Sequence, residues 1–157
     1  MPDDLAPPAP LLLAGFLPYR FSIVAERISR AFAARYQAEF GLSIPEWRVM
    51  AVLGERAPRS TQEVIETTEM DRVKVSRAVI RLADKALLRR QAHPQDQRAQ
   101  LLRLSRRGLE VYRRIVPLAH AMQAELAAAL TDDEVRALDS ILPKLHAAAG
   151  TLAGGTR

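Results

Sequence analysis

The chain has 157 residues, which is enough for one domain with extensions and too few for two independent catalytic lobes. It contains no cysteine, which excludes disulfides, thiolate metal sites and cysteine nucleophiles. The longest apolar run, residues 11–17, is far shorter than the roughly 20 residues that span a bilayer, and it follows acidic residues. We therefore expect a soluble, cytoplasmic protein that has no membrane partner.

Basic residues are concentrated in one part of the chain, residues 71–114, which we call the basic block. The formal net charge is +5, yet the basic block holds 13 basic and 4 acidic residues, whereas the remainder holds 10 basic and 14 acidic ones. Arginine predominates in the block, and arginine suits phosphate and guanine recognition. A solvated charged face is one reading of this pattern, and a polyanionic partner such as nucleic acid is the other.

The chain begins with an arm and a helix. Residues 1–18 contain five prolines, which predicts a flexible or extended arm. Apolar residues then recur at helical spacing over residues 19–40, and Gly41 is suited to a left-handed helix end. The sequence therefore predicts a first helix over residues 19–40.

Two capping boxes predict the next two helices. Ser43-Ile44-Pro45-Glu46 combines an N-cap serine, a first-turn proline and a glutamate, and the helix after it stops at Gly54. Ser60-Thr61-Gln62-Glu63 begins a short helix that ends at residues 66–68.

Asp71 can cap a fourth helix over residues 72–85, which has a narrow apolar stripe and an otherwise basic surface. The stripe comprises Val75, Val79, Leu82 and Ala86, and the remaining surface carries Arg72, Lys74, Ser76, Arg77 and Arg81. Two strand-like segments follow, residues 88–92 and 99–104, separated by polar turn formers. We expect a β-hairpin with a charged tip.

Two long helices complete the chain. Ser105 caps one that continues to Leu130 and is bent by Pro117. A third capping box, Thr131-Asp132-Asp133-Glu134, begins a last helix that is kinked at Pro143 and ends at Gly150. Residues 151–157 are expected to be a flexible tail.

The helices at residues 60–68 and 71–86 form a helix-turn-helix, and the basic hairpin after them makes it a winged one. A helix fits the DNA major groove, and an arginine on the hairpin tip can enter the narrow minor groove. A helical pair that merely packs would not explain why arginine and lysine crowd the second helix and the hairpin. Double-stranded DNA is therefore the expected partner.

Four segments in register resemble the multiple-antibiotic-resistance regulator (MarR) family. They are residues 41–53 (GLSIPEWRVMAVL), 73–82 (VKVSRAVIRL), 94–98 (PQDQR) and 102–108 (LRLSRRG), and they resemble the family's second helix, recognition helix, wing and entry to the long helix. The resemblance covers residues 19–149. Ala86 departs from the pattern, because the family commonly has glycine before the wing.

The resemblance implies which residues contact DNA. It implies base reading by Lys74, Ser76 and Arg77 near the start of the recognition helix, and an arginine in the minor groove that a neighbouring aspartate positions. The full set of expected DNA-binding residues is Arg72, Val73, Lys74, Ser76, Arg77, Arg81, Asp96 and Arg98. Arg81 is expected to contact phosphate or to have a structural role.

The expected fold class is mainly α with a small β-hairpin, a winged helix-turn-helix with N- and C-terminal dimerisation helices. Residues 19–150 form a single unit, in which residues 42–104 bind DNA and residues 19–40 and 105–150 dimerise. The terminal helices have broad apolar faces and the last ones are rich in alanine, which fits the family's use of them in a homodimer. The alternative is that these helices fold back on their own chain.

Many family members release DNA when a small molecule binds. Tyr19, Arg20 and Trp47 could hold an aromatic carboxylate, because arginine clamps a carboxylate while an aromatic ring stacks on the ligand. Trp47 as a plain core residue and Arg20 as a surface residue are the alternatives.

The sequence predicts no enzyme, no cofactor and no metal site. His93, His120 and His146 lack ligand spacing, and neither a glycine-rich phosphate loop nor a nucleophile elbow occurs. The favoured function is therefore a dimeric, sequence-specific transcription regulator, a repressor released by a small ligand. The alternatives are a ligand-independent or architectural DNA-binding protein, and a protein–protein module that has lost DNA binding.

Overall fold

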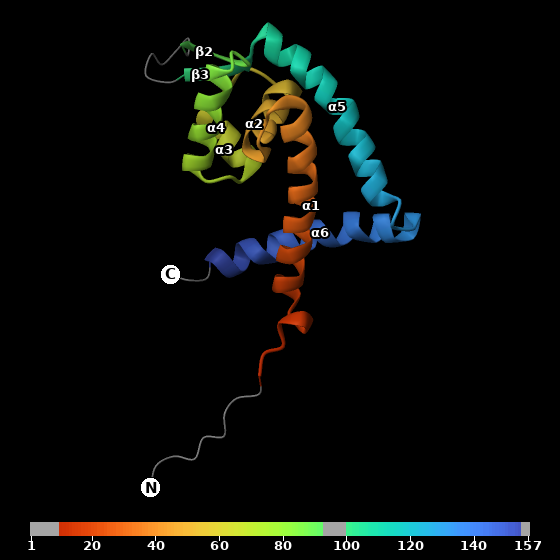
Figure 1. Ribbon diagram of the computed structural model, residues 1–157. Coiled ribbons are helices and arrows are strands. Elements are labelled where there is room, and N and C mark those ends of the chain that lie inside the picture. The colour runs from red at the N-terminus through yellow and green to blue at the C-terminus, as the bar shows by residue number, and fades with distance from the viewer. Residues whose placement is uncertain (1–9, 93–99, 155–157) are drawn as a thin grey trace. The chain divides into compact units, whose positions relative to one another are not determined.

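The computed structural model describes residues 10–92 and 100–154 and divides into two compact units. The first unit, up to Tyr112, contains a short 3-10 helix, η1, four complete helices, three strands and the start of α5 (Figure 1). Its elements are η1 (Leu13–Gly15), α1 (Leu17–Phe40), α2 (Ile44–Glu55), β1 (Arg59–Ser60), α3 (Thr61–Thr68), α4 (Arg72–Asp84), β2 (Leu88–Ala92) and β3 (Gln100–Leu104). The second unit, from Arg113, contains the remainder of α5 (Arg106–Ala127) and α6 (Asp132–Gly154).

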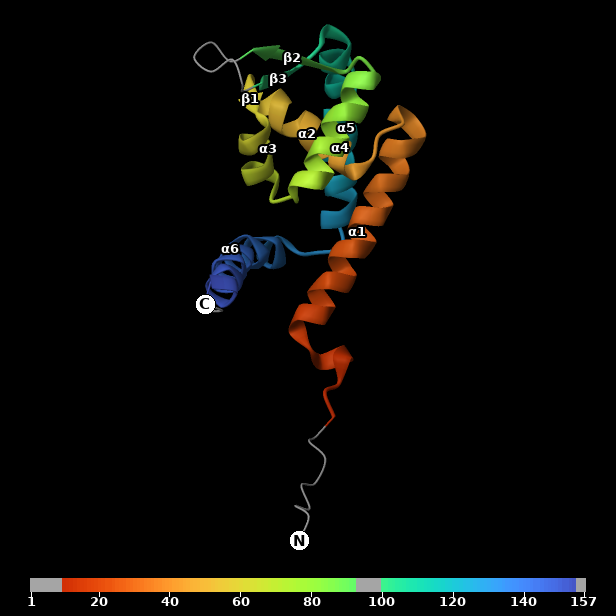
Figure 2. The same ribbon diagram turned by 90° about the vertical axis from the view of Figure 1, so that its left-hand side faces the viewer.

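The strands form one antiparallel sheet in the order β1-β3-β2, at one end of the helices α2 to α4 (Figure 2). In the hairpin, Leu88 lies opposite Leu104 and Arg89 opposite Arg103. The expected hairpin is thus present, but the sequence missed β1, which pairs Arg59 with Leu102. Two residues are too few to show the alternation by which a strand is recognised.

The core of the first unit lies between α2, α3, α4 and the sheet, where α4 packs against α2 and α3. Its fully or almost fully buried side chains include Leu42, Val49, Met50, Leu53, Val64, Val75, Ala78, Val79, Leu82 and Leu102. Three of the four residues expected in the α4 stripe are buried, but Ala86 is exposed and lies beyond the helix end at Asp84. The mainly α fold with a small antiparallel sheet, arranged as a winged helix-turn-helix, is confirmed.

The helix starts follow from local hydrogen bonds, as the sequence predicts. The capping boxes at Ser43 and Ser60 are both complete. The Asp71 side chain accepts a hydrogen bond from the Lys74 amide, and the Ser105 hydroxyl accepts one from the Gly108 amide. The Thr131 box is likewise formed with Glu134.

Several helix ends differ from the prediction by a few residues. The helix α1 begins at Leu17 with Pro18 in its first turn, so the end of the expected flexible arm is structured. The helix α5 ends at Ala127 instead of Leu130, and α6 continues through Gly150 to Gly154, so residues 151–154 are helical instead of tail. Both Pro117 and Pro143 lie inside their helices.

Gly54 was predicted to end its helix, yet α2 continues to Glu55. A Cβ atom at Gly54 would overlap the ring of Tyr112. Glycine therefore occurs here because α2 and the start of α5 approach closely, which is a packing requirement that the local sequence does not reveal. None of the described helices is both long and apolar enough to cross a membrane.

Candidate nucleic-acid interface

The helix α4 has a buried face and a basic, solvent-exposed face. Its buried residues share one side of the helix, and the opposite side carries Val73, Arg77 and Ile80 in a line, because these positions are three or four residues apart. Ser76 lies beside this line and is half-buried, while Arg72, Lys74 and Arg81 flank it and are exposed. The helix-turn-helix formed by α3 and α4 thus presents the expected α4 residues on its surface.

The cations of α4 differ in how they are held. The Arg72 Nη2 atom donates a hydrogen bond to Gln62 Oε1 of α3 at 3.1 Å, which ties the two helices together. The Lys74 ammonium lies 3.1 Å from the Asp71 carboxylate, an exposed ion pair. Among the described residues Arg77 forms neither a hydrogen bond nor an ion pair, so its guanidinium has its full donor capacity for a ligand.

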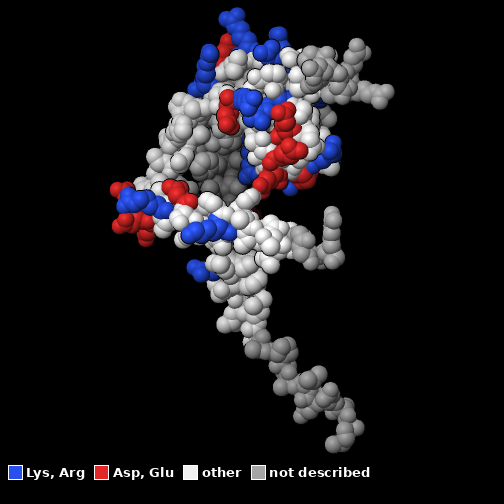
Figure 3. Space-filling model, turned by 180° about the vertical axis from the view of Figure 1, so that it is seen from behind, with Lys and Arg blue, Asp and Glu red and all other residues white. Residues whose placement is uncertain are grey.

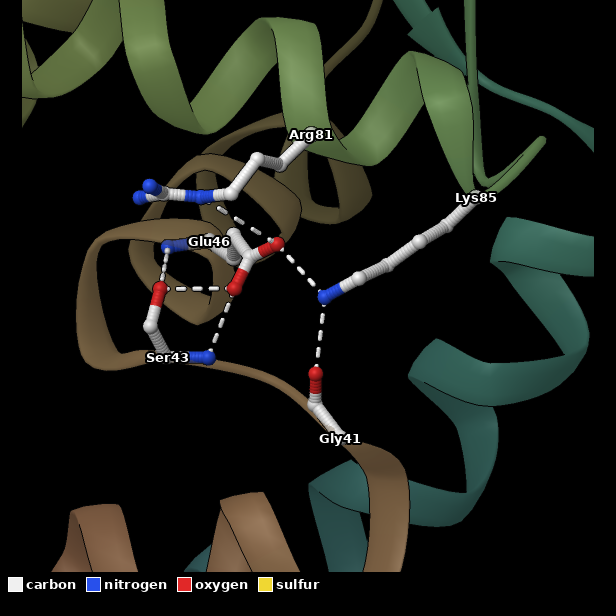
Figure 4. Close-up of polar contacts among 5 residues, drawn as sticks. All are labelled: Gly41, Ser43, Glu46, Arg81 and Lys85. Atoms are coloured by element: carbon white, nitrogen blue, oxygen red, sulfur yellow. Dashed lines mark hydrogen bonds and ion pairs between the residues drawn. The ribbon is translucent and has the colours of Figure 1, made fainter.

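A buried carboxylate, Glu46, fixes α4 against α2 (Figure 4). Its side chain is 3% exposed, its Oε1 atom lies 2.7 Å from Lys85 Nζ and 3.8 Å from Arg81 Nε, and its Oε2 atom accepts a hydrogen bond from the Ser43 hydroxyl at 2.6 Å. The Lys85 ammonium also donates to the Gly41 carbonyl oxygen at 2.7 Å. Burial by itself would raise the pKa of Glu46, but the hydrogen bonds from Lys85 and Ser43 outweigh it and lower the pKa below its ordinary value.

Arg81 and Lys85 therefore both interact with the buried carboxylate of Glu46. Arg81 was expected to contact phosphate or to be structural, and its contact with Glu46 favours the structural role. Sequence reasoning missed Lys85 and Glu46 as a pair, because they lie 39 residues apart and each has an ordinary local role.

A hollow of about 210 Å³ lies between α4 and the sheet. It is lined by Thr61, Ser76, Val79, Ile80, Arg90, Gln100 and Leu102. Arg90 belongs to β2 and pairs with Leu102 on the side of the sheet that faces α4. The hollow thus lies between the exposed face of α4 and Arg90 of the β2–β3 hairpin, which we call the wing.

The outer side of the wing carries a like-charge pair. Arg89 and Arg103 are directly opposite each other in the β2–β3 register, and both are exposed. Like charges opposite each other destabilise a sheet unless an anion is near, so this pair favours a polyanionic partner. The wing tip, including the expected residues Asp96 and Arg98 and also His93, lies outside the described residues. On the face seen in Figure 3, by contrast, basic and acidic side chains are intermixed.

The three residues expected to bind a ligand are not brought together within one chain. Tyr19 and Arg20 lie in the first turn of α1, whereas Trp47 contacts Tyr36 near the other end of that helix, with ring centroids 5.4 Å apart. Tyr36 follows Tyr19 by seventeen positions along α1, a helical rise of about 25 Å. Trp47 also stacks on Tyr112 at 6.0 Å, so it is part of an aromatic cluster.

The described residues contain no cluster of three or more metal-ligating side chains. His120 is exposed at the C-terminal half of α5, and His146 is on α6.

Comparison with known proteins agrees with the fold. A sequence model of the MarR family matches residues 40–99, which span α2, the helix-turn-helix and most of the wing. Over these residues, which are less than half of the chain, the sequence is similar to the MarR family. Proteins of the MarR family are DNA-binding transcription regulators with a winged-helix fold. None of the curated proteins compared with the chain matches it.

Solved structures resemble the chain over most of its length. The PcaV transcriptional regulator from Streptomyces coelicolor, in complex with its natural ligand, is 26% identical, with a TM-score of 0.75 over 90% of this chain and 99% of PcaV. The BpsR regulator of Bordetella bronchiseptica, whose DNA binding is regulated by 6-hydroxynicotinic acid, is 21% identical, with a TM-score of 0.80 over 88% of this chain and 98% of BpsR. MepR of S. aureus, solved in complex with DNA, is 16% identical, with a TM-score of 0.78 over 85% of this chain and 98% of MepR.

Proposed function

We propose that this chain is a repressor of the MarR type, homodimeric and sequence-specific, and that a small aromatic carboxylate releases it from its operator. The DNA-binding part of the proposal rests on the exposed face of α4. There Arg77 has no partner among the described residues, and α4 itself is held by the helix-turn-helix. Residues 42–104 form the DNA-binding region in this proposal.

The chemistry of α4 suits the major groove. Arg77 can donate two parallel hydrogen bonds to guanine, and Ser76 can donate to or accept from either base of a pair. Arg72 and Lys74 flank them within reach of phosphates, and Val73 occupies the start of the helix. Arg98 would enter the minor groove, positioned by Asp96.

Exposed apolar side chains support a homodimer through residues 19–40 and 105–150. Helix α1 exposes Phe21 and Val24, and α6 separately exposes Leu138, Ile141 and Leu142, each by 37% or more. Long amphipathic helices with such faces usually bury them against a partner. A two-fold dimer would bind a pseudo-palindrome with half-sites about 10 base pairs apart.

The effector site would require two chains. Because Tyr19 and Arg20 lie about 25 Å along α1 from the contacts of Trp47, an aromatic acid could meet all three residues only if a second copy supplied one part of the site. BpsR supports the ligand class, since 6-hydroxynicotinic acid is itself an aromatic carboxylic acid.

DNA binding is tested with the promoter beside the protein's own gene in a mobility-shift assay, against a scrambled duplex of equal length. Arg77→Ala should weaken specific binding by about 10- to 100-fold, because a bidentate arginine–guanine contact contributes about 1–3 kcal/mol. The control is Arg30→Ala, an exposed α1 residue paired with Glu26 and remote in sequence from the basic block. Equal binding of wild type to both duplexes would refute sequence specificity.

The effector is tested by a thermal-shift screen of benzoate, hydroxybenzoate, cinnamate and 6-hydroxynicotinate. We expect at least one compound to raise the melting temperature of the wild type, to weaken DNA binding, and to lose both effects in Arg20→Ala. If no compound acts through Arg20, the alternative is favoured: a ligand-independent or architectural DNA-binding protein that uses the same basic block.

A further inference from the structure

The outward face of α4 carries two large apolar side chains that the core does not use. Val73 is 56% exposed and Ile80 is 51% exposed. They are seven residues apart, two helical turns, and Arg77 lies between them on the same face. β-Branched residues lose side-chain freedom in a helix, so local helix formation does not explain them either.

Both apolar side chains are surrounded by groups suited to nucleic acid. Val73 lies next to Arg72 and Lys74 in the first turn of α4. Ile80 lines the hollow between α4 and the sheet together with Ser76 and Arg90. The chemistry of this face therefore suits an anion that also presents apolar groups.

The major groove of DNA has this combination. Among the four bases only thymine presents an apolar group there, its C5 methyl, and it does so between two phosphate backbones. Val73 and Ile80 are separated by a helical rise of about 10 Å, which equals about three base-pair steps of 3.4 Å. Two apolar contacts on either side of one arginine can thus fall within a single half-site.

We propose that Val73 and Ile80 contact thymine methyl groups on either side of the base pair that Arg77 reads. The inference rests on the proposed sequence-specific DNA binding and adds to it the class of half-site: a guanine flanked by thymines within about three base-pair steps. Ile80 is the additional specificity-determining residue. The thymine methyl group that it contacts would lie at the hollow between α4 and the sheet.

The experiment removes single methyl groups from the DNA. Binding duplexes are selected from a random-sequence pool with the full-length protein, and each thymine of the preferred half-site is replaced in turn by deoxyuridine. Affinities are measured by fluorescence anisotropy at one salt concentration for wild type, Val73→Ala and Ile80→Ala. Folding of the variants is verified by circular dichroism, and neither position is in the core.

We expect deoxyuridine to weaken wild-type binding about fourfold at each of two positions, the effect of one lost methyl contact. Val73→Ala should lose the sensitivity at one position and Ile80→Ala at the other, which a double-mutant cycle detects as coupling. The matched control is Leu12→Ala, which shortens an exposed leucine outside the DNA-binding and dimerisation segments and should keep both sensitivities.

Two kinds of result overturn the inference and are distinguishable. If the wild type binds a preferred sequence but tolerates deoxyuridine, or if the sensitivity does not depend on both side chains, the methyl contacts are refuted while the proposed function stands. If no duplex in the pool is preferred over another, the proposed function fails as well.

Discussion

Ala86 adopts a left-handed conformation, with φ at 57°, in the turn between α4 and β2. Alanine is strained there, whereas glycine adopts positive φ freely. We expect Ala86→Gly to raise the free energy of unfolding by about 0.5–1 kcal/mol, measured by urea denaturation at a fixed protein concentration. Ala83→Gly in the last turn of α4 is the control and should lower stability by about 1 kcal/mol. Destabilisation by both changes would contradict the assigned turn.

The ion pair of Glu46 with Lys85 makes stability depend on pH in a defined direction. The pKa of Glu46 is lowered in the folded protein, so the stabilisation is complete above its ordinary value of 4.5 and is lost as the pH falls through the folded pKa. In Lys85→Met the buried Glu46 carboxylate no longer has the hydrogen bond and the charge of Lys85 to offset its burial. The pKa of Glu46 in the folded protein should therefore rise.

We therefore expect Lys85→Met to lower the free energy of unfolding by about 2 kcal/mol at pH 7. This is below the usual loss for a fully buried pair, because Lys85 is 37% exposed and Arg81 remains near the carboxylate. The difference from wild type should shrink between pH 7 and pH 4, since protonation removes the uncompensated charge. Arg30→Met breaks an exposed pair and should have little effect at either pH. A pH-independent difference would show that lost packing, not charge, is responsible.

Gly108 allows the start of α5 to approach the turn between α4 and β2 closely. A Cβ atom there would overlap the carbonyl oxygen of Leu87, a backbone atom that also accepts a hydrogen bond from the Ser105 amide at 3.0 Å. We expect Gly108→Ala to lower the free energy of unfolding by about 2 kcal/mol or more. Gly150→Ala in α6, where a Cβ meets nothing within 4 Å, should instead raise it by up to about 1 kcal/mol. Thermal denaturation at one protein concentration compares the two, and a loss at Gly108 no larger than at Gly150 would contradict the close approach.

The elements also show what the sequence can and cannot predict. Capping boxes are readable because all their hydrogen bonds form within three residues, as between Ser43 and Glu46. Gly54 was misread because its neighbour, Tyr112, is distant in sequence. The same applies to β1, whose partner strand lies about forty residues later, and to the ion pair of Glu46 with Lys85. The α4 face was predicted correctly in outline because a helix places its residues by period alone.

The exposed apolar face of α6 predicts that the protein self-associates. Sedimentation analysis at micromolar concentration should give about twice the chain mass of 17.4 kDa. Ile141→Glu, at a position 44% exposed, should shift the protein toward monomer and weaken operator binding, because a dimer contacts two half-sites. Glu55→Lys, at an exposed position of α2 outside both dimerisation segments, should leave the mass unchanged. A monomeric wild type would refute the dimer and the two-chain effector site together.

The charge distribution over the whole chain predicts how DNA binding responds to salt. Residues 71–114 hold 13 basic residues, whereas the acidic remainder should repel DNA. Each phosphate neutralised by a cation adds about 0.9 to the slope of log affinity against log salt concentration. Arg98→Ala in the wing should therefore weaken operator binding and reduce that slope by about one, measured by fluorescence anisotropy over a salt series. Arg30→Ala, on α1 outside the basic block, should leave the slope unchanged. If Arg98→Ala keeps both the affinity and the slope of the wild type, the wing arginine does not contact DNA, and the cations on α4 and the strands must account for the electrostatic attraction by themselves.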